Sequence, residues 1–120
     1  MRQLYEQGRA DSQTEVYLVV FRSRLLAGAD IHKLLKDDEA AHFEASQAPG
    51  YITYFKGAAD TDGNNLSFCL WQSQNSAREA AFGEKHKLAA GNVSEAYAYF
   101  SLQRYFVSQA QDGDVVFIPA

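Results

Sequence analysis

The sequence has few residues of the kinds that form cross-links or common catalytic motifs. Its single cysteine, Cys69, rules out an intrachain disulfide and a cysteine metal cluster. Because Cys69 lies in an apolar stretch, we expect it to be an inert core thiol. The eight glycines form neither a GxGxxG fingerprint nor a Walker pattern, and no serine-centred nucleophile elbow occurs. The chain therefore lacks the motifs of dinucleotide-binding proteins, phosphate-loop proteins and serine hydrolases.

Charge and hydropathy argue against two further classes of partner. The 11 basic and 15 acidic residues give a net charge of -4, so no basic field attracts nucleic acid. No segment approaches the roughly 18 consecutive apolar residues that a membrane-spanning helix needs. The first residues, Met1 to Gln7, lack the apolar centre of a secretory signal. We therefore expect a cytoplasmic protein with neither nucleic-acid nor membrane partners.

The most informative segments present are strands that are apolar on both faces. Glu15 to Phe21 and Leu66 to Trp71 do not alternate cleanly between apolar and polar residues. A sheet with one solvated face is expected to alternate in this way. Each fully buried large side chain stabilises by roughly 1.5–3 kcal/mol, so a second copy of the sheet is a suitable cover. The pattern predicts a homodimer that pairs through one sheet face.

The order of the predicted elements indicates an α+β, ferredoxin-like fold of the βαββαβ type. We expect a four-stranded antiparallel sheet with two helices on one face and a short extra strand at the C-terminus. Residues 1–14 are predicted to be a polar N-terminal arm, and residues 15–120 a single domain. The tail strand has two open alternatives, which are pairing within its own chain and pairing with a partner's sheet. The expected strands are 15–24, 51–56, 66–71, 101–108 and 115–118, and the expected helices begin after Asp30 and after Ser73 or Asn75. We expect the second helix to bend at Gly83, and Ser94 to Phe100 to form one or two further helical turns.

Two short segments of the sequence resemble segments of a known group of proteins. Leu70-Trp71-Gln72-Ser73 lies directly before a predicted helix, and Pro49-Gly50-Tyr51 leads into the second predicted strand. With the strand order, they resemble the dimeric α+β barrel superfamily over about residues 15–108. The resemblance implies two sheets paired into a barrel and a small-molecule pocket between helices and sheet.

The same resemblance implies a range of functions. Members include cofactor-free monooxygenases of antibiotic biosynthesis, lactone isomerases and proteins with no known activity. It therefore implies a cofactor-independent small-molecule enzyme, monooxygenase-like or isomerase-like, with no cofactor. The alternative is a non-catalytic ligand-binding protein, or a structural or stress-associated dimer, of the same fold.

Two histidines and one aspartate are the candidate catalytic residues. His42 follows Asp38 by four residues, so both side chains share a helix face. A carboxylate behind an imidazole raises its basicity, as general-base chemistry requires, although the pair is also an ordinary surface contact. His86 follows Phe82 by four residues and enters the pocket if Phe82 faces the sheet; otherwise it is a surface histidine. His32 is expected to be solvated.

Four residues are candidates for ligand binding, namely Trp71, Tyr54, Arg104 and Phe82. Trp71 ends a strand at the sheet rim, where it either walls a pocket or packs in the core or dimer. Arg104 lies inside an apolar strand and needs a partner, which is an acidic ligand or a carboxylate across the dimer. Two histidines without an evident third ligand do not favour a metal site.

Overall fold

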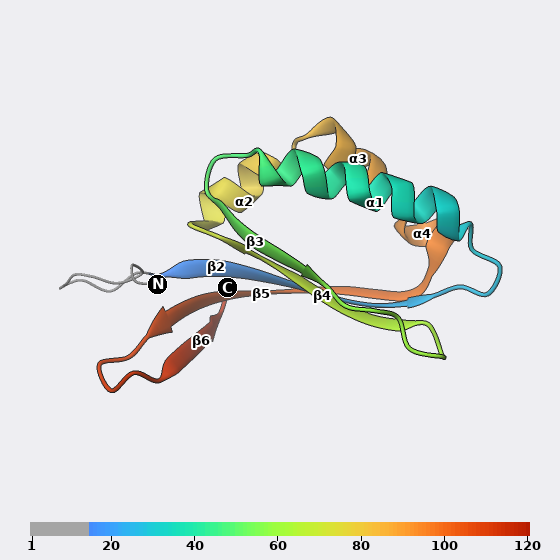
Figure 1. The fold of residues 1–120 in the computed structure, drawn as a ribbon. Helices are drawn as coiled ribbons and strands as arrows, with labels where there is room; N and C mark the ends of the chain where they lie inside the picture. The colour runs from blue at the N-terminus through green and yellow to red at the C-terminus, as the bar shows by residue number, and fades with distance from the viewer. Residues whose placement is uncertain (1–14) are drawn as a thin grey trace.

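The computed structural model describes residues 15–120, and the predicted polar arm of residues 1–14 lies outside the described residues. A five-stranded antiparallel sheet has the order β3-β4-β2-β5-β6, and all the described helices cover one of its faces (Figure 1). The predicted ferredoxin-like α+β fold with a short extra strand is therefore confirmed. The strands are β2 (Val16–Leu25), β3 (Tyr51–Lys56), β4 (Asn64–Trp71), β5 (Tyr97–Gln109) and β6 (Val115–Pro119), and the helices are α1 (Ile31–Ser46), α2 (Gln74–Ala80), α3 (Glu84–Ala90) and α4 (Val93–Ala96).

Side-chain caps fix where the first two helices begin. Asp30 Oδ1 accepts a hydrogen bond from the backbone N–H of Lys33 at 3.0 Å, as the predicted N-cap of α1. Ser73 Oγ accepts one from the backbone N–H of Ser76 at 3.0 Å, so Ser73, rather than Asn75, caps α2. At the other end of α1, Gly50 takes a positive φ of 85°, which lets the chain turn directly into β3.

Two predicted boundaries are wrong. The second helix is not one bent helix, because it ends at Ala80 and a new helix, α3, starts after Gly83. The fourth predicted strand, β5, starts at Tyr97 rather than at residue 101. Only the four residues of α4 are therefore helical directly before it. The reason is the ladder with β2, which reaches as far as the pairing of Leu25 with Tyr97. Cross-strand pairing overrides the local helical propensity there.

The strand registers divide the sheet into two apolar faces. On the helix side, Tyr17 pairs with Trp71 and Val19 pairs with Cys69. Tyr17 and Trp71 are 3% and 4% exposed and form the core cluster with Val19. On the outer side, Leu18 pairs with Leu70 of β4. The double-sided apolar character of the sequence therefore corresponds to one helix-covered face and one uncovered face.

The tail strand pairs within its own chain. Residues from Val115 to Pro119 pair with β5 from Gln109 back to Tyr105. Figure 1 shows the β5–β6 hairpin bending away from the helix layer. Of the two alternatives that the sequence left open, the chain adopts pairing in cis.

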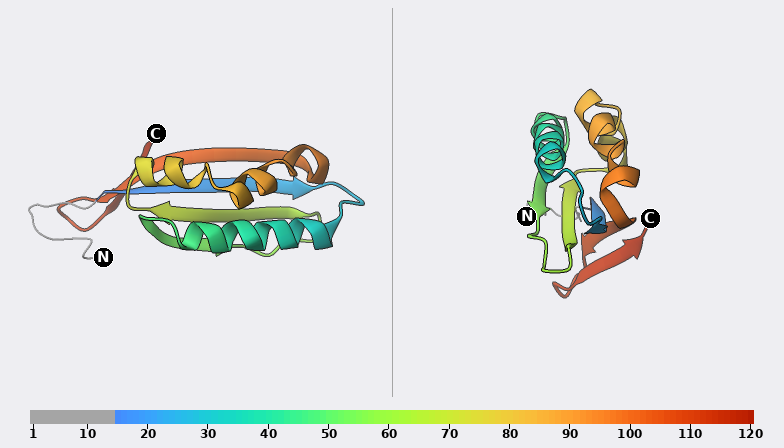
Figure 2. Two further views of the ribbon diagram at one scale, coloured as in Figure 1. Left: turned by 90° about the horizontal axis from the view of Figure 1, so that it is seen from above. Right: turned by 90° about the vertical axis from the view of Figure 1, so that its right-hand side faces the viewer.

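The helix layer consists of two rows. Figure 2 shows α1 along the β3 and β4 side of the sheet, and α2, α3 and α4 along the β2 and β5 side. In the part of the chain that the structure describes, no helix is both long and apolar enough to cross a bilayer.

Candidate functional site

A cavity of about 730 Å³ lies between the helices and the helix side of the sheet. Its floor is crossed by rows of residues that pair from strand to strand. The middle row runs from Tyr54 on β3 through Cys69 and Val19 to Arg104 on β5. The rows on either side contain Lys56, Ser67, Phe21 and Leu102, and Tyr51, Trp71, Tyr17 and Phe106. Residues of α1, α2 and α3 line the cavity from above.

His42 lines the cavity from α1 and sits against two tyrosines of β3. Its ring centroid is 4.8 Å from that of Tyr54 and 6.2 Å from that of Tyr51. Of the side chains described in this chain, it has the one buried nitrogen or oxygen without a hydrogen-bond partner, which is Nδ1. A buried polar atom in this state is unfavourable and is uncommon in folded proteins. A ligand that hydrogen-bonds to His42 Nδ1 would therefore satisfy a buried polar atom.

Asp38 also lines the cavity, but it does not act as the carboxylate behind the imidazole. Its Oδ2 lies 3.4 Å from Lys56 Nζ on β3, and no hydrogen bond links it to His42 in the described structure. Burial raises the pKa of Asp38, the charge and hydrogen bond of Lys56 oppose that rise, and Asp37 adds to it. The predicted shared helix face brings Asp38 and His42 to one cavity without joining them directly.

Two cavity tyrosines are held in their neutral form. Burial raises the pKa of Tyr54, partly offset by a hydrogen bond from Ser67. Burial, with smaller effects of Asp38 and Tyr54, raises the pKa of Tyr97 to about 12. Sequence reasoning missed Tyr97 because it assigned that segment to a helical turn. The three aromatic residues of Tyr97-Ala98-Tyr99-Phe100 are the strand signal that would have found it.

Trp71 has both of the roles that the sequence left open. It packs in the core cluster and also lines the cavity. Its Nε1 donates a hydrogen bond to Cys69 Sγ at 3.1 Å, and its ring meets Tyr51 edge-on at 5.7 Å. Burial raises the pKa of the Cys69 thiol, so this cysteine stays protonated near neutral pH, as an inert thiol does.

His86 and Phe82 are separated by the break between α2 and α3. His86 lines the cavity from α3, whereas Phe82 is 65% exposed and lies outside the lining. The Lys87 ammonium lies 5.7 Å from the centroid of the Phe82 ring. The i,i+4 spacing that linked Phe82 to His86 assumed one continuous helix, and Gly83 interrupts it. His86 therefore lines the cavity as an exposed side chain of α3, and Phe82 does not line it.

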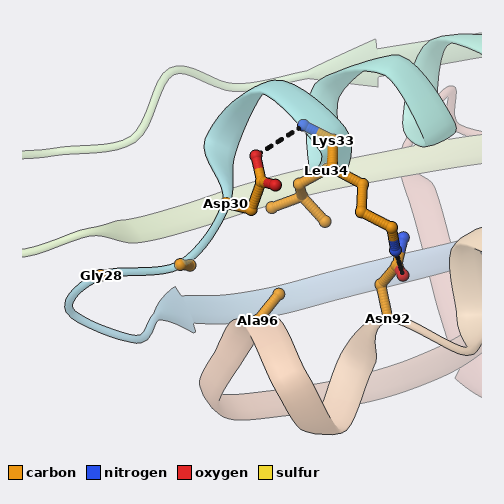
Figure 3. A pocket seen from close by; sticks show the side chains of 7 residues that line it. Gly28, Asp30, Lys33, Leu34, Asn92 and Ala96 are labelled. Carbon is orange, nitrogen blue, oxygen red and sulfur yellow. Dashed lines mark hydrogen bonds between the residues drawn. The ribbon is translucent and has the colours of Figure 1, made fainter.

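A smaller cavity of about 140 Å³ lies where the start of α1 meets α4. Figure 3 shows Lys33 reaching from α1 to Asn92, and the Nζ–Oδ1 distance is 2.9 Å. Asn92 is 7% exposed, and its Nδ2 donates to Asp37 Oδ2 at 2.8 Å. Leu34 lines both this cavity and the large one. This polar network therefore ties the two helix rows together at one end of the large cavity.

Basic side chains outnumber acidic ones around the large cavity. Lys56, Arg78 and Arg104 line it, and Asp38 is the one carboxylate among the described lining residues. The sequence singled out Arg104 but not Arg78, which lies in the last turn of α2. Among the side chains described by the structure, no group of three or more histidine, cysteine, aspartate or glutamate residues is suited to a metal ion.

Residues 1–118 match the PB2B2.08-like protein family. The chain belongs to this family. A relative in the family is the UPF0643 protein PB2B2.08 of Schizosaccharomyces pombe, which is 31% identical over 103 residues. That match covers 81% of this chain and 47% of the yeast protein, so the PB2B2.08-like chain spans about half the length of its curated relative.

Solved structures similar to this PB2B2.08-like chain share its fold at low sequence identity. A conserved protein from Methanosarcina mazei Go1 has a TM-score of 0.67 at 13% identity, covering 77% of this chain and 92% of that one. SnoaB, a cofactor-independent oxygenase from Streptomyces nogalater, has a TM-score of 0.56 at 13% identity, with coverages of 74% and 90%. An antibiotic biosynthesis monooxygenase has a TM-score of 0.64 at 12% identity, with coverages of 73% and 94%. The predicted resemblance to the dimeric α+β barrel superfamily is confirmed at the level of fold.

Proposed function

We propose that the large cavity is the active site of a cofactor-independent enzyme that removes a proton from an aromatic small molecule. The observation that carries this proposal is the unpartnered Nδ1 of His42, in the wall of an otherwise mainly apolar cavity. A free imidazole nitrogen is a base, which suits it to accept a proton from a phenol or an activated C–H group.

The neighbouring residues have the properties that this step needs. Tyr54 and Tyr97 have phenols that are neutral at physiological pH, and burial raises their pKa values further, so both can donate hydrogen bonds to a substrate oxygen. Donors aimed at developing negative charge stabilise the transition state in a site that excludes water. Asp38, paired with Lys56, places a carboxylate in the same cavity as the imidazolium that forms.

After proton removal, two reactions are open to the substrate anion. In a monooxygenase reaction, a methylene group and O₂ give a carbonyl group and water, and all four electrons come from the substrate. In an isomerase reaction, the proton returns to a different carbon and no O₂ is consumed. The fold that the chain shares with the oxygenase SnoaB supports the first reaction.

Oxygen uptake distinguishes these reactions. Anthrone is a suitable probe, because its methylene is acidified by a carbonyl on the same ring system. We expect O₂ consumption with anthrone, and a loss of about 100-fold or more in the rate for His42→Asn. His32→Asn is the matched control, because His32 is exposed and does not line the cavity. Equal rates for His42→Asn and the unmodified protein would refute His42 as the base.

One observation favours a non-catalytic binding protein as the second candidate. Asp38 is directed to Lys56, so His42 lacks the hydrogen-bonded carboxylate that commonly orients a catalytic imidazole. Under this alternative, aromatic compounds bind to the unmodified protein and to His42→Asn alike, without turnover by either.

We also propose that the outer face of the sheet is covered by a second copy of the chain. No large side chain among the described residues is fully buried, which is unusual for a domain of this size. Several large apolar side chains on the outer side of the strands are exposed, notably Phe55, Leu66, Tyr99 and Phe117. Large apolar side chains exposed together on one sheet face are typical of an interface rather than of a solvated face.

A further inference from the structure

We infer that the ligand of the large cavity is a flat aromatic anion, held by its acid group at Arg104 with its rings toward His42 and Tyr54. This inference rests on the proposal that the cavity is a small-molecule site. It adds the chemical class of the ligand and its orientation along one row of the sheet.

The charge around the cavity favours an anion. The whole chain has a net charge of -4, yet the described cavity lining holds three basic residues and one acidic residue. The Asp38 carboxylate lies 3.4 Å from the Lys56 ammonium and neutralises its charge, so the charges of the two arginines remain. Among the side chains that the structure describes, neither Arg78 nor Arg104 has a carboxylate within 4.0 Å. The surplus positive charge in this acidic protein thus lies on Arg78 and Arg104.

The middle row of the floor gives the length of the ligand. Arg104 pairs with Val19, Val19 with Cys69, and Cys69 with Tyr54. Adjacent strands are about 4.8 Å apart, so three spacings place the Arg104 and Tyr54 backbones about 14 Å apart. Because side chains stand roughly perpendicular to a sheet, mainly the contact distances at the two ends occupy part of that length. The remainder accommodates two or three fused aromatic rings between the guanidinium and the tyrosine.

The surfaces between these two ends suit a flat ring system. Val19 and Cys69 form the apolar middle of the row, with Trp71 and Phe21 in the flanking rows. Burial keeps the Cys69 thiol uncharged, as contact with a ring requires. A flat, largely apolar ligand with one polar end therefore matches the floor better than a compact or sugar-like one.

The two arginines come from different elements on the same side of the molecule. Arg104 projects from β5, and Arg78 belongs to α2, which packs through Ala77 and Ala80 on the core cluster. Arginine matches a carboxylate because its planar guanidinium donates two parallel hydrogen bonds. We assign Arg104 as the primary contact, because it belongs to the row that ends at Tyr54, and Arg78 as a second donor.

Calorimetric titration with 2-naphthoate and 2-naphthamide tests the inference, because these probes differ mainly in charge. We expect the unmodified protein to bind 2-naphthoate at least about 10-fold more tightly than 2-naphthamide. Arg104→Gln is expected to abolish this preference, Arg104→Lys to retain part of it, and Arg78→Gln to reduce it. Arg24→Gln is the matched control, since Arg24 is an exposed arginine of β2 outside the cavity lining.

Each outcome separates the inference from the proposed function. Equal binding of the two probes, a preference that survives Arg104→Gln, or no binding of either probe would overturn the inference. If the preference depends on Arg104 while His42→Asn turns over substrate normally, the anion site stands and the proposed catalytic role fails. Circular dichroism of each variant verifies that the fold is retained.

Discussion

Glu44 of α1 caps the N-terminus of α3, because its Oε1 accepts a hydrogen bond from the backbone N–H of His86 at 3.2 Å. Its Oε2 accepts a second one from the backbone N–H of Lys85, also at 3.2 Å. Gly83, the N-cap residue, has no side chain to serve this purpose, and a Cβ there would collide with the Glu44 carboxylate. A contact across more than forty residues thus replaces a local cap and fixes the helix that carries His86.

Removing this long-range cap is expected to destabilise the fold. We predict that Glu44→Ala lowers the free energy of unfolding by about 1 kcal/mol, the usual effect of losing a helix cap. Glu39→Ala, an exposed glutamate on the same helix, serves as the control and should change little. Urea denaturation measures both. Equal stabilities of the two variants would contradict the capping role.

Asn92 is expected to be among the polar residues most sensitive to substitution. It is buried between Lys33 and Asp37, and Asn92→Ala leaves both without their partner amide. We predict a loss of about 1–3 kcal/mol in the free energy of unfolding. The exposed Asn75→Ala, at the start of α2, is the matched control. A thermal midpoint for Asn92→Ala that equals that of Asn75→Ala would show that this network does not hold the helix rows together.

Stability should fall in alkaline solution because of the cavity tyrosines. The pKa of Tyr97 is raised from 10.0 to about 12 by burial. The unfolded chain therefore releases this proton first, so stability that is full below pH 10 is lost as the pH rises toward about 12. The raised pKa values of Tyr54 and Cys69 act in the same direction.

Phenylalanine variants test this pH dependence. Tyr97→Phe should lose less stability than the unmodified protein between about pH 10 and about pH 12, measured by urea denaturation. Tyr99→Phe, which removes an exposed phenol from the neighbouring part of β5, should follow the unmodified protein. Parallel losses for all three proteins would show that burial of Tyr97 does not contribute.

Disruption of the outer sheet face should produce a monomer. Leu66 of β4 is 42% exposed on that face, so Leu66→Glu places a charge in the proposed interface. We predict that sedimentation gives roughly twice the chain mass for the unmodified protein at micromolar concentration, and one chain mass for Leu66→Glu. Phe43 lies on α1, away from the outer sheet face, and is 67% exposed, so Phe43→Glu should remain dimeric. A monomeric unmodified protein would refute the interface.

The sequence predicts the fold well where one local signal dominates. The caps Asp30 and Ser73 and the two-sided apolar strands are local features, and each corresponds to the structure. The break at Gly83 was not predictable in the same way, because the group that stabilises it, Glu44, lies far away in sequence. The early start of β5 likewise depends on pairing with Leu25.

The site was partly predictable for the same reason. Helical spacing places His42 and Asp38 on one face of α1. Strand alternation places Tyr54 and Trp71 on the helix side of the sheet, and both faces line the same cavity. Periodicity does not specify which partner a charged group selects. Asp38 pairs with Lys56, which enters the cavity from a different element, and Arg78 enters from a helix whose orientation depends on the break after it.

The central claim is that the space between helices and sheet binds a ligand at His42. Its most direct test is an NMR titration with 2-naphthoate of protein labelled in its histidines and its single tryptophan. We predict saturable shifts of the His42 and Trp71 ring signals, both of which line the cavity, and no shift of the His32 ring outside it. Unmoved His42 and Trp71 signals at saturating 2-naphthoate, or a shift confined to His32, would contradict the account.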